Sequence, residues 1–414
     1  MKKFIAICTI AAFAAAAHSQ TVYIWKDNVA TAVNAAAAGD FVYTRGGTVL
    51  TVLNTSFNIA DIDSITLGTP VDEQTVSVAY SGSKATAVVP IALAQTVSVA
   101  ISGAYVSATS TATDGDDIVY ALSGTSSDGA FLQNGTYKCT LALNGVNLTS
   151  RQGAAIEFVN GKRINVVLAD GSTNTLADFA GGLQRGCFRV KGHPEFSGNG
   201  TLNVTGNANH GISTSEYMQV KSGTINVLSA ANDGIHAGQY FMMDGGKVSV
   251  SNTKGDGIQA DVTTDVGDTL NGQMIINGGQ IDVAVTSDDV KGIRSDSNMT
   301  INGGTITVNM SGAGVKGIAA DGALAINQSA GATTNIRVTV SGGIFHENQL
   351  DESKTRGVRV KGNFDLLGGT LNVTANGKKA KSVKVDGTST RSRKATATLR
   401  GNGSNDFSFD RTVN

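Results

Sequence analysis

The chain is built on a repeated tetrad of the form Gly-Ile-x-Ala, which recurs through the second half of the sequence. The first two intervals are both 23 residues, and the later ones are 35, 25 and 40. Units of this length are too small to bury a core alone, so each must stack on its neighbours. The tetrads are GIST at Gly211, GIHA at Gly234, GIQA at Gly257, GIRS at Gly292, GIAA at Gly317 and GVRV at Gly357, followed by a degenerate SVKV at Ser382.

A second signature lies between the tetrads and joins paired glycines to alternating apolar residues, as in INGGQIDV and INGGTITV. Three short strands and three turns in one repeat are typical of a parallel β-helix coil. We therefore expect an all-β, right-handed parallel β-helix of about ten coils, stacked roughly 4.8 Å apart. Two inward ladders follow from the repeat: Ile212, Ile235, Ile258, Ile293, Ile318, Val358 and Val383, and Ile225, Val248, Ile281, Ile306 and Leu371.

Three segments are expected along the chain. Residues 1–19 combine two lysines, an apolar stretch and a small-residue end, which predicts a cleavable signal peptide and an exported protein, located in the periplasm, on the cell surface or outside the cell. Residues 20–113 form a small β-rich N-terminal module or cap, and residues 114–414 form the solenoid. No later stretch is long and apolar enough for membrane insertion. Cys139 and Cys187 are either a disulfide or two buried small residues.

Charge is unevenly distributed along the chain. The formal net charge is −1, which argues against a nucleic-acid partner. From Lys354 to Arg400, however, twelve Lys or Arg residues face only Asp365 and Asp386. This basic segment is either a solvated face or a surface that meets an anion.

The residue before each tetrad glycine forms a corner ladder, which begins with His210 and continues with acidic residues. Asp233 and Asp256 fall on adjacent coils, and like charges at that spacing repel unless a cation or a proton lies between them. Clusters of oxygen ligands without surrounding His or Cys favour Ca²⁺ over zinc, whereas the alternative is that these residues simply cap turns. The predicted calcium ligands are Asp233, Asp256, Asp261, Asp288 and Asp289.

The same ladder then becomes basic and predicts a ligand-binding surface. Lys291, Lys316 and Arg356 continue it, while the position two residues after each glycine adds His236, Gln259, Arg294 and Arg359. Such side chains on a flat sheet suit sugar hydroxyls or carboxylates, so a polysaccharide is the expected partner. We find no motif for nucleophilic catalysis and no metal-spaced group among the five histidines, and therefore expect no catalytic residues.

The motifs NGVNLTS, LADGSTNTL, FSGNGTLNVTGNANHGI and the DGIHAG/DGIQAD pair resemble those of the bacterial carbohydrate-binding domain-containing family, which is typified by a clostridial cellulose- and pectin-binding β-helix. The resemblance covers about residues 118–414. It implies a parallel β-helix with calcium between coils, binding to plant polysaccharides, and a fold related to family nine pectate lyases. Asp233 and Asp256 match the implied calcium positions, whereas KGI replaces DGI at Lys291 and Lys316.

Three functions are consistent with these features. The first is an exported, non-catalytic binder of acidic plant polysaccharide such as polygalacturonate, or of cellulose. The second is a structural or adhesive surface solenoid, which needs only stacked coils. The third is a calcium-dependent polyuronate lyase, in which Lys291 would have to lose its proton despite the neighbouring carboxylates.

Overall fold

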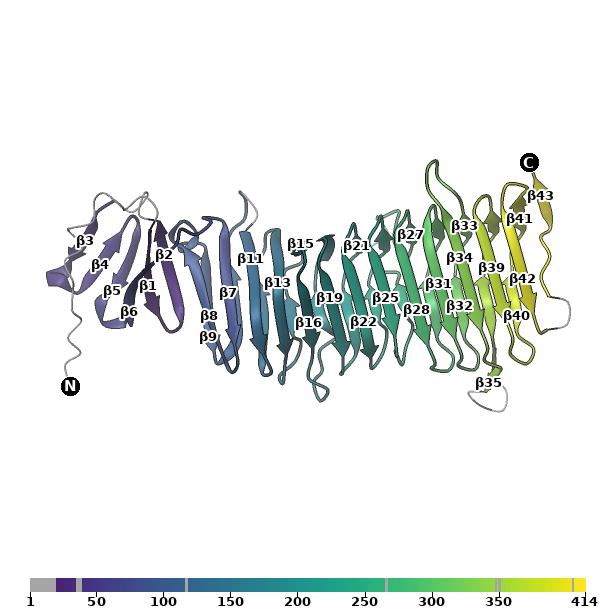
Figure 1. Ribbon diagram of the computed structural model, residues 1–414, viewed down its shortest axis with the longest axis horizontal. Helices are drawn as coiled ribbons and strands as arrows, with labels where there is room; N and C mark the ends of the chain where they lie inside the picture. Colours follow the sequence, from purple (N-terminus) through teal and green to yellow (C-terminus); the bar gives the residue numbers. More distant parts are fainter. Residues whose placement is uncertain are drawn as a thin grey trace.

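The computed structural model describes residues 20–34, 39–115, 118–264, 267–346, 348, 351–403 and 406–414. The predicted signal peptide, residues 1–19, lies outside them. The chain forms a long rod in which the N-terminal module stands at one end and the last coil at the other (Figure 1). Nearly all regular structure is β-strand, and no helix in the described part is long and apolar enough to cross a membrane.

The rod is a parallel β-helix with three faces, as the repeat predicts. The tetrads form the first face, called here the tetrad face, which ends in an antiparallel hairpin of β9 (Val97–Ser102) and β10 (Ala104–Ser110). Ten parallel rungs follow β10, in agreement with the expected number of coils. They are β12 (Gly129–Asn134), β14 (Ile156–Phe158), β17 (Gly186–Val190), β20 (His210–Thr214), β23 (Ile235–Ala237), β26 (Ile258–Ala260), β29 (Lys291–Ser295), β32 (Lys316–Ala320), β37 (Arg356–Val360) and β40 (Lys381–Val385).

Two further ladders complete each coil. One consists of β11 (Ile118–Ser126), β13 (Cys139–Thr149), β15 (Arg163–Leu168), β18 (His193–Gly198), β21 (Met218–Val220), β24 (Phe241–Met243), β27 (Met274–Ile276), β30 (Met299–Ile301), β33 (Leu324–Ile326), β38 (Phe364–Leu366), β41 (Ser389–Ser392) and β43 (Arg411–Val413). The other consists of β16 (Thr173–Ala177), β19 (Thr201–Gly206), β22 (Thr224–Ala230), β25 (Lys247–Ser251), β28 (Gln280–Val285), β31 (Gly304–Met310), β34 (Thr334–Val340), β39 (Thr370–Ala375) and β42 (Thr396–Gly401).

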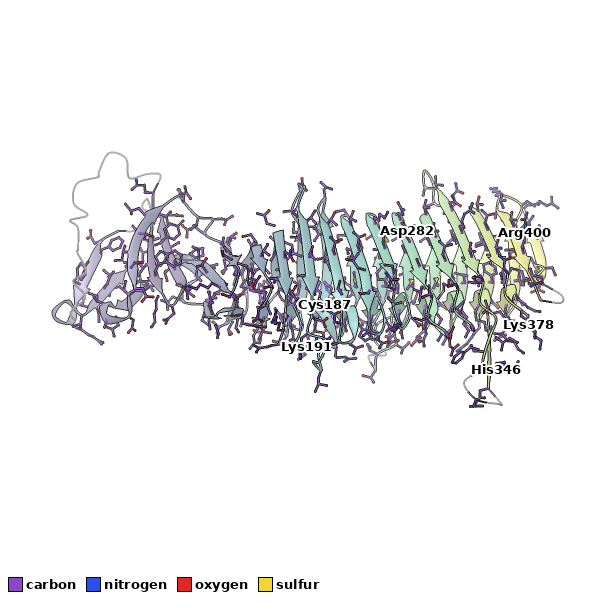
Figure 2. All side chains as sticks on the ribbon, turned by 60° about the horizontal axis from the view of Figure 1, so that its bottom comes forward. Cys187, Lys191, Asp282, His346, Lys378 and Arg400 are labelled. Carbon is purple, nitrogen blue, oxygen red and sulfur yellow. The ribbon has the colours of Figure 1, made fainter. Side chains whose placement is uncertain are left out.

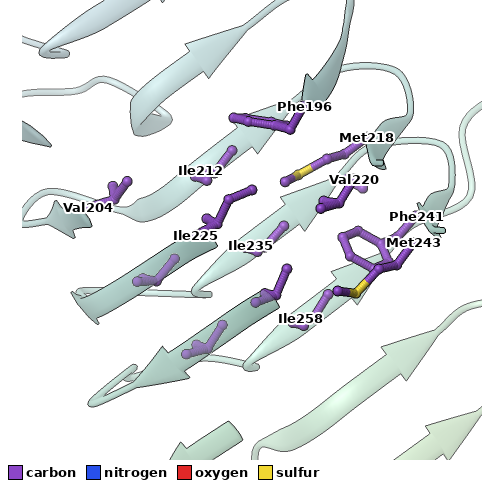
Figure 3. Packing of buried hydrophobic residues seen from close by; sticks show 14 of the residues in the cluster. Phe196, Val204, Ile212, Met218, Val220, Ile225, Ile235, Phe241, Met243 and Ile258 are labelled. Atoms are coloured by element: carbon purple, nitrogen blue, oxygen red, sulfur yellow. The ribbon is translucent and has the colours of Figure 1, made fainter. Parts of the chain in front are cut away.

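The inward ladders form one continuous core. Ile212 pairs with Ile235, Ile235 with Ile258, and the register continues to Val383, with every member buried. Figure 3 shows this ladder packed against Phe196, Met218 and Phe241. The second expected ladder is incomplete, because Ile336 of β34 stands between Ile306 and Leu371. Its strand was missed because the turn before it has the sequence QSAGATT and not a glycine pair.

The glycines of both signatures have distinct structural roles. A Cβ on the tetrad residue Gly317 would lie 2.3 Å from Val338 Cγ1 and 2.6 Å from the Gly357 carbonyl oxygen of the next coil. The second glycine of the paired signature instead adopts a positive φ, which is 84° at Gly279 and 96° at Gly304. Only glycine takes these two roles readily, so the repeat depends on both.

An asparagine ladder lies beside the paired glycines and was not anticipated. The Asn277 amide donates to Asp244 Oδ1 at 2.7 Å, the Asn302 amide to Asn277 at 2.9 Å, and the Asn327 amide to Asn302 at 2.9 Å. Each side chain thus bonds the equivalent residue of the preceding coil. These bonds satisfy polar groups at the turns and hold the coils in register.

The N-terminal end has two parts. A small core of Val22, Ile24, Val33, Leu50, Val52 and Ile91 lies among β1 (Thr21–Lys26), β2 (Val29–Asn34), β3 (Phe41–Thr44), β4 (Val49–Val52), β5 (Thr55–Asn58) and β6 (Ser64–Gly68), with short 3₁₀ turns at Arg45–Gly47, Ile59–Asp61 and Ile91–Leu93. By contrast, β7 (Thr75–Ser81), β8 (Lys84–Pro90), β9 and β10 share the solenoid core, and β7 pairs with β11. The boundary at residues 113/114 stays a prediction.

Two local features complete the fold. A hairpin of β35 (Ile344–His346) and β36 (Glu352–Lys354) projects from the rod, and Figure 2 shows His346 on this projection. The hairpin lies within the 40-residue interval between Gly317 and Gly357 and contributes to its length. Cys139 and Cys187 are buried thiols, and no disulfide joins them. Burial raises the pKa of the Cys187 thiol well above its ordinary value.

Candidate functional site

The tetrad face aligns the predicted site residues in two parallel ladders. Along the strand centre, Ser213 pairs with His236, His236 with Gln259, and Gln259 with Arg294; Ala319, Arg359 and Lys384 follow. The corner ladder runs beside it, and its basic half is paired in the order Lys291, Lys316, Arg356, Lys381. The register that was derived from the repeat is therefore the register of the fold.

Asp233 lies between two imidazoles. Its Oδ2 atom is 3.2 Å from His210 Nδ1 and 3.2 Å from His236 Nδ1, and the two rings stack with their centroids 4.4 Å apart. All three side chains are buried or nearly so, with exposed fractions of 7%, 8% and 12% for His210, Asp233 and His236. Burial alone would raise the pKa of Asp233, but the two histidines and a backbone amide outweigh it and hold that pKa well below its ordinary range.

Asp261 supports this cluster from the neighbouring coil. Its Oδ2 atom lies 3.3 Å from His236 Nε2, and its Oδ1 atom accepts a hydrogen bond from the Gln259 amide. Both nitrogens of His236 therefore face carboxylates. This brings three of the predicted residues, Asp233, His236 and Asp261, together with His210, which was not among them.

A second group surrounds Arg294. Its guanidinium lies 2.7 Å from Asp296 Oδ1 and 3.6 Å from Asp256 Oδ2. Burial raises the pKa of the Asp256 carboxyl, although Lys291 opposes the effect. Burial also raises the pKa of Asp296. The nearby Asp261 carboxylate raises this pKa further, whereas the positive charge of Arg294 lowers it. This part of the acidic ladder already contains its own cation.

The third group joins Asp289 to Lys316. Lys316 Nζ lies 2.9 Å from Asp289 Oδ1, which also accepts from the Ser353 hydroxyl of the projecting hairpin. Lys291 Nζ donates to the backbone carbonyl of Asp289 at 3.3 Å. Burial lowers the pKa of Lys316 despite the contact with Asp289. Asp288 is exposed, and its Oδ1 accepts the Ala313 amide at 2.6 Å.

The remaining predicted ligand-binding residues, Arg356 and Arg359, both lie on β37. Arg356 donates to the carbonyls of Thr355 and Lys379, at 2.6 and 3.2 Å. Arg359 contacts Asp386 Oδ2 at 2.5 Å, and Lys384 lies 3.3 Å from the same carboxylate. The basic half of the face is thus only partly neutralised.

The strand-centre ladder is less open than expected for an exposed polar sheet. Ser213, Gln259 and Ala319 are buried, whereas Arg294 and Arg359 are half-buried. Longer neighbours fold across the short residues: the Arg189 guanidinium bonds the Ser213 carbonyl at 3.3 Å. Access to a ligand is therefore greatest at the cationic end.

The predicted calcium ligands do not form an oxygen-only cluster. Calcium takes six to eight oxygen ligands. Here, Asp233 and Asp261 face imidazoles, Asp256 faces a guanidinium, and Asp289 faces an ammonium group. This donor set does not fit calcium at the described positions. From the sequence we found no metal-spaced group among the histidines, whereas the structure stacks the rings of His210 and His236, which are 26 residues apart in the chain.

An aromatic stack was also missed. His193, Tyr217 and Tyr240 lie on successive coils, with ring centroids 4.4 and 4.6 Å apart. A hollow of about 560 Å³ beside them is lined by residues that include Lys191, Glu216, Tyr217, Gln239 and Asp268. Both faces of the Tyr217 ring are covered by its neighbours. A sugar could therefore contact mainly the edges of the stacked rings.

Three comparisons with known proteins found similar sequences or structures. A family model described as carbohydrate-binding domain-containing protein matches residues 102–380, which is more than half of the chain. A carbohydrate-binding domain-containing protein of Acetivibrio thermocellus is 30% identical over 112 residues, or 25% of this chain; the chain spans only 39% of the length of that relative. A solved polysaccharide lyase-like protein from C. thermocellum, a gadolinium derivative, aligns with a TM-score of 0.50 at 25% identity, covering 62% of this chain and 98% of that one. The chain belongs to the carbohydrate-binding domain-containing protein family.

Proposed function

We propose that this protein is an exported, non-catalytic binder of acidic plant polysaccharide, and that the glycan lies along the cationic half of the tetrad face. The observation that carries the proposal is the register of Lys291, Lys316, Arg356 and Lys381, one cation on each successive coil. Parallel strands repeat at roughly 4.8 Å, so this row offers a periodic line of positive charge. An extended polyanion such as polygalacturonate suits such a line.

The partial neutralisation of the row supports an anionic ligand. Arg356 hydrogen-bonds two carbonyl oxygens and, within the described part of the chain, no carboxylate. Lys291 likewise donates to a carbonyl oxygen. A uronate carboxylate would supply the missing counter-charge, and the contact would weaken with added salt.

Retention of the protein on immobilised polygalacturonate, compared with cellulose, tests the proposal. We expect retention on polygalacturonate that falls steeply between low and high salt. Failure to bind either polymer would contradict polysaccharide binding and favour an adhesive or structural solenoid. Salt-independent binding to cellulose alone would move the site away from the cationic row. Repeating the experiment with a chelator tests whether calcium is required, and a bound calcium ion stays a prediction. We expect retention on polygalacturonate to persist in the chelator.

Lyase activity is a second candidate, because burial lowers the pKa of Lys316 and the solved neighbour is called lyase-like. A lysine base must lose its proton at the working pH. Lys316 instead lies against the Asp289 carboxylate, which stabilises its charged form. Incubation with polygalacturonate at alkaline pH, followed by ultraviolet absorbance of unsaturated products, separates the two functions. We expect a flat trace; a signal that Lys316→Gln abolishes would make the protein an enzyme.

A further inference from the structure

The cluster of His210, Asp233 and His236 contains a buried nitrogen without a hydrogen bond. His210 Nδ1 lies 3.2 Å from Asp233 Oδ2 but makes no hydrogen bond with any described residue, and the His210 side chain is only 7% exposed. A buried polar atom left in this way is costly. Its surroundings therefore call for a partner that accepts a nitrogen lone pair.

The three side chains have the separations of metal ligands. One ligand atom from each lies within 4.8 Å of the others, and the carboxylate oxygen is 3.2 Å from each Nδ1. Imidazole nitrogen and carboxylate oxygen bind zinc at about 2.0–2.2 Å, so tetrahedral geometry separates neighbouring donors by roughly 3.3 Å. The two nitrogen–oxygen separations are close to that value.

Asp261 contacts the second ring nitrogen of His236, as a carboxylate commonly does for a metal-binding histidine. It lies 3.3 Å from His236 Nε2, the nitrogen that faces away from Asp233. A carboxylate that accepts a hydrogen bond from Nε2–H fixes the tautomer in which the Nδ1 lone pair is directed into the cluster. Gln259 in turn bonds the other oxygen of Asp261 and keeps the carboxylate in place.

We propose that His210, Asp233 and His236 bind a first-row divalent transition metal ion of the Zn²⁺ or Co²⁺ type, with one coordination position left for water or a ligand oxygen. Two nitrogen donors and one carboxylate match the ligand preference of these ions, whereas calcium prefers oxygen alone. The site is independent of the polysaccharide proposal, because it occupies coils before the cationic row.

The test uses the full mature chain after removal of bound metal. Addition of Co²⁺ should give the intense visible absorption of a tetrahedral or five-coordinate ion, and Zn²⁺ should abolish it by competition, whereas millimolar Ca²⁺ should not. Zn²⁺ should also raise the melting temperature, since a ligand that binds only the folded state stabilises it. Absence of both the Co²⁺ spectrum and the Zn²⁺ shift would overturn the proposal and leave an imidazole–carboxylate ion pair.

Variants assign the signal to these residues. Asp233→Asn removes the ligand charge but retains an oxygen that can accept the Asp256 amide, and His210→Gln removes a nitrogen donor; both should lose the Co²⁺ band. Asp261→Asn should weaken metal affinity by about 10-fold. His193→Gln is the matched control, because His193 also contacts a carboxylate, Glu216, but lies outside the cluster. Unfolding curves recorded without metal check that both variants are folded. A Co²⁺ band that survives in folded His210→Gln and Asp233→Asn would contradict the assignment.

Discussion

The backbone amide of Asp256 donates to Oδ1 of Asp233 on the preceding coil, at 2.7 Å. The next step repeats the contact, because Lys291 N–H donates to Asp256 Oδ1 at 2.8 Å. This series of hydrogen bonds ends at Lys291, because its side chain has no carboxylate to accept one. The Lys316 backbone amide donates to the Val290 carbonyl oxygen instead. The acidic half of the corner ladder therefore links coil to coil through hydrogen bonds.

Replacement of Asp256 separates the hydrogen bond from the charge. Asp256→Ala leaves the Lys291 amide without its acceptor and should lower the free energy of unfolding by about 1–3 kcal/mol. Asp256→Asn keeps an acceptor and removes a buried charge, so it should be much less destabilising. Chemical unfolding followed by circular dichroism measures both. Equal loss in the two variants would show that the negative charge, and not the hydrogen bond, stabilises the coil.

The tetrad glycine is expected to tolerate no side chain. In Gly317→Ala the new methyl group would overlap Val338 and the next coil, so we expect a loss of about 1–3 kcal/mol or more from overpacking. Gly161→Ala is the control, because a Cβ there meets nothing within 4 Å. Thermal melting of the two variants gives the comparison. A Gly317→Ala protein as stable as Gly161→Ala would contradict close coil packing at the tetrad.

The sequence predicted most of the fold but less of the site, for a physical reason. Repeat period and alternation determine which residues face inward, so the ladder from Ile212 to Val383 was derived correctly. Side-chain partners depend instead on how neighbouring coils orient polar groups. The imidazole contacts of Asp233 and the contact between Asp289 and the hairpin residue Ser353 come from such orientation. The position of β34 was missed because its turn lacks the glycine signature.

Glu195 should make stability depend on pH in the acid range. Burial would raise the pKa of Glu195, but hydrogen bonds from Lys221 and Tyr217, at 2.6 and 2.7 Å, lower it overall. A group with a lowered folded-state pKa stabilises the protein above its unfolded pKa of about 4.3, and this stabilisation is lost as the pH falls through the folded value.

Glu195→Gln therefore should cost about 1 kcal/mol at pH 7, and the difference from wild type should shrink toward pH 3. Glu157→Gln serves as the control, since the Glu157 carboxylate makes no hydrogen bond or ion pair with a described residue. Urea unfolding at several pH values measures the effect. A difference that grows on acidification would show that the pKa is raised and not lowered.

Loss of two cations from the tetrad face should weaken binding to acidic polysaccharide. Lys291 and Arg356 are the best choices, because the side chains of both donate hydrogen bonds to carbonyl oxygens. The double variant Lys291→Gln/Arg356→Gln should bind polygalacturonate about 10-fold more weakly, as expected for about 1–2 kcal/mol of lost charge interaction, and its salt dependence should be shallower.

Arg337→Gln is the matched control: Arg337 is exposed on β34, in the same coil as Lys316 but on another face. Affinity electrophoresis in polygalacturonate gels compares the three proteins. Equal retardation of the double variant and Arg337→Gln would place the glycan elsewhere on the rod, whereas selective loss in the double variant would assign it to the cationic row.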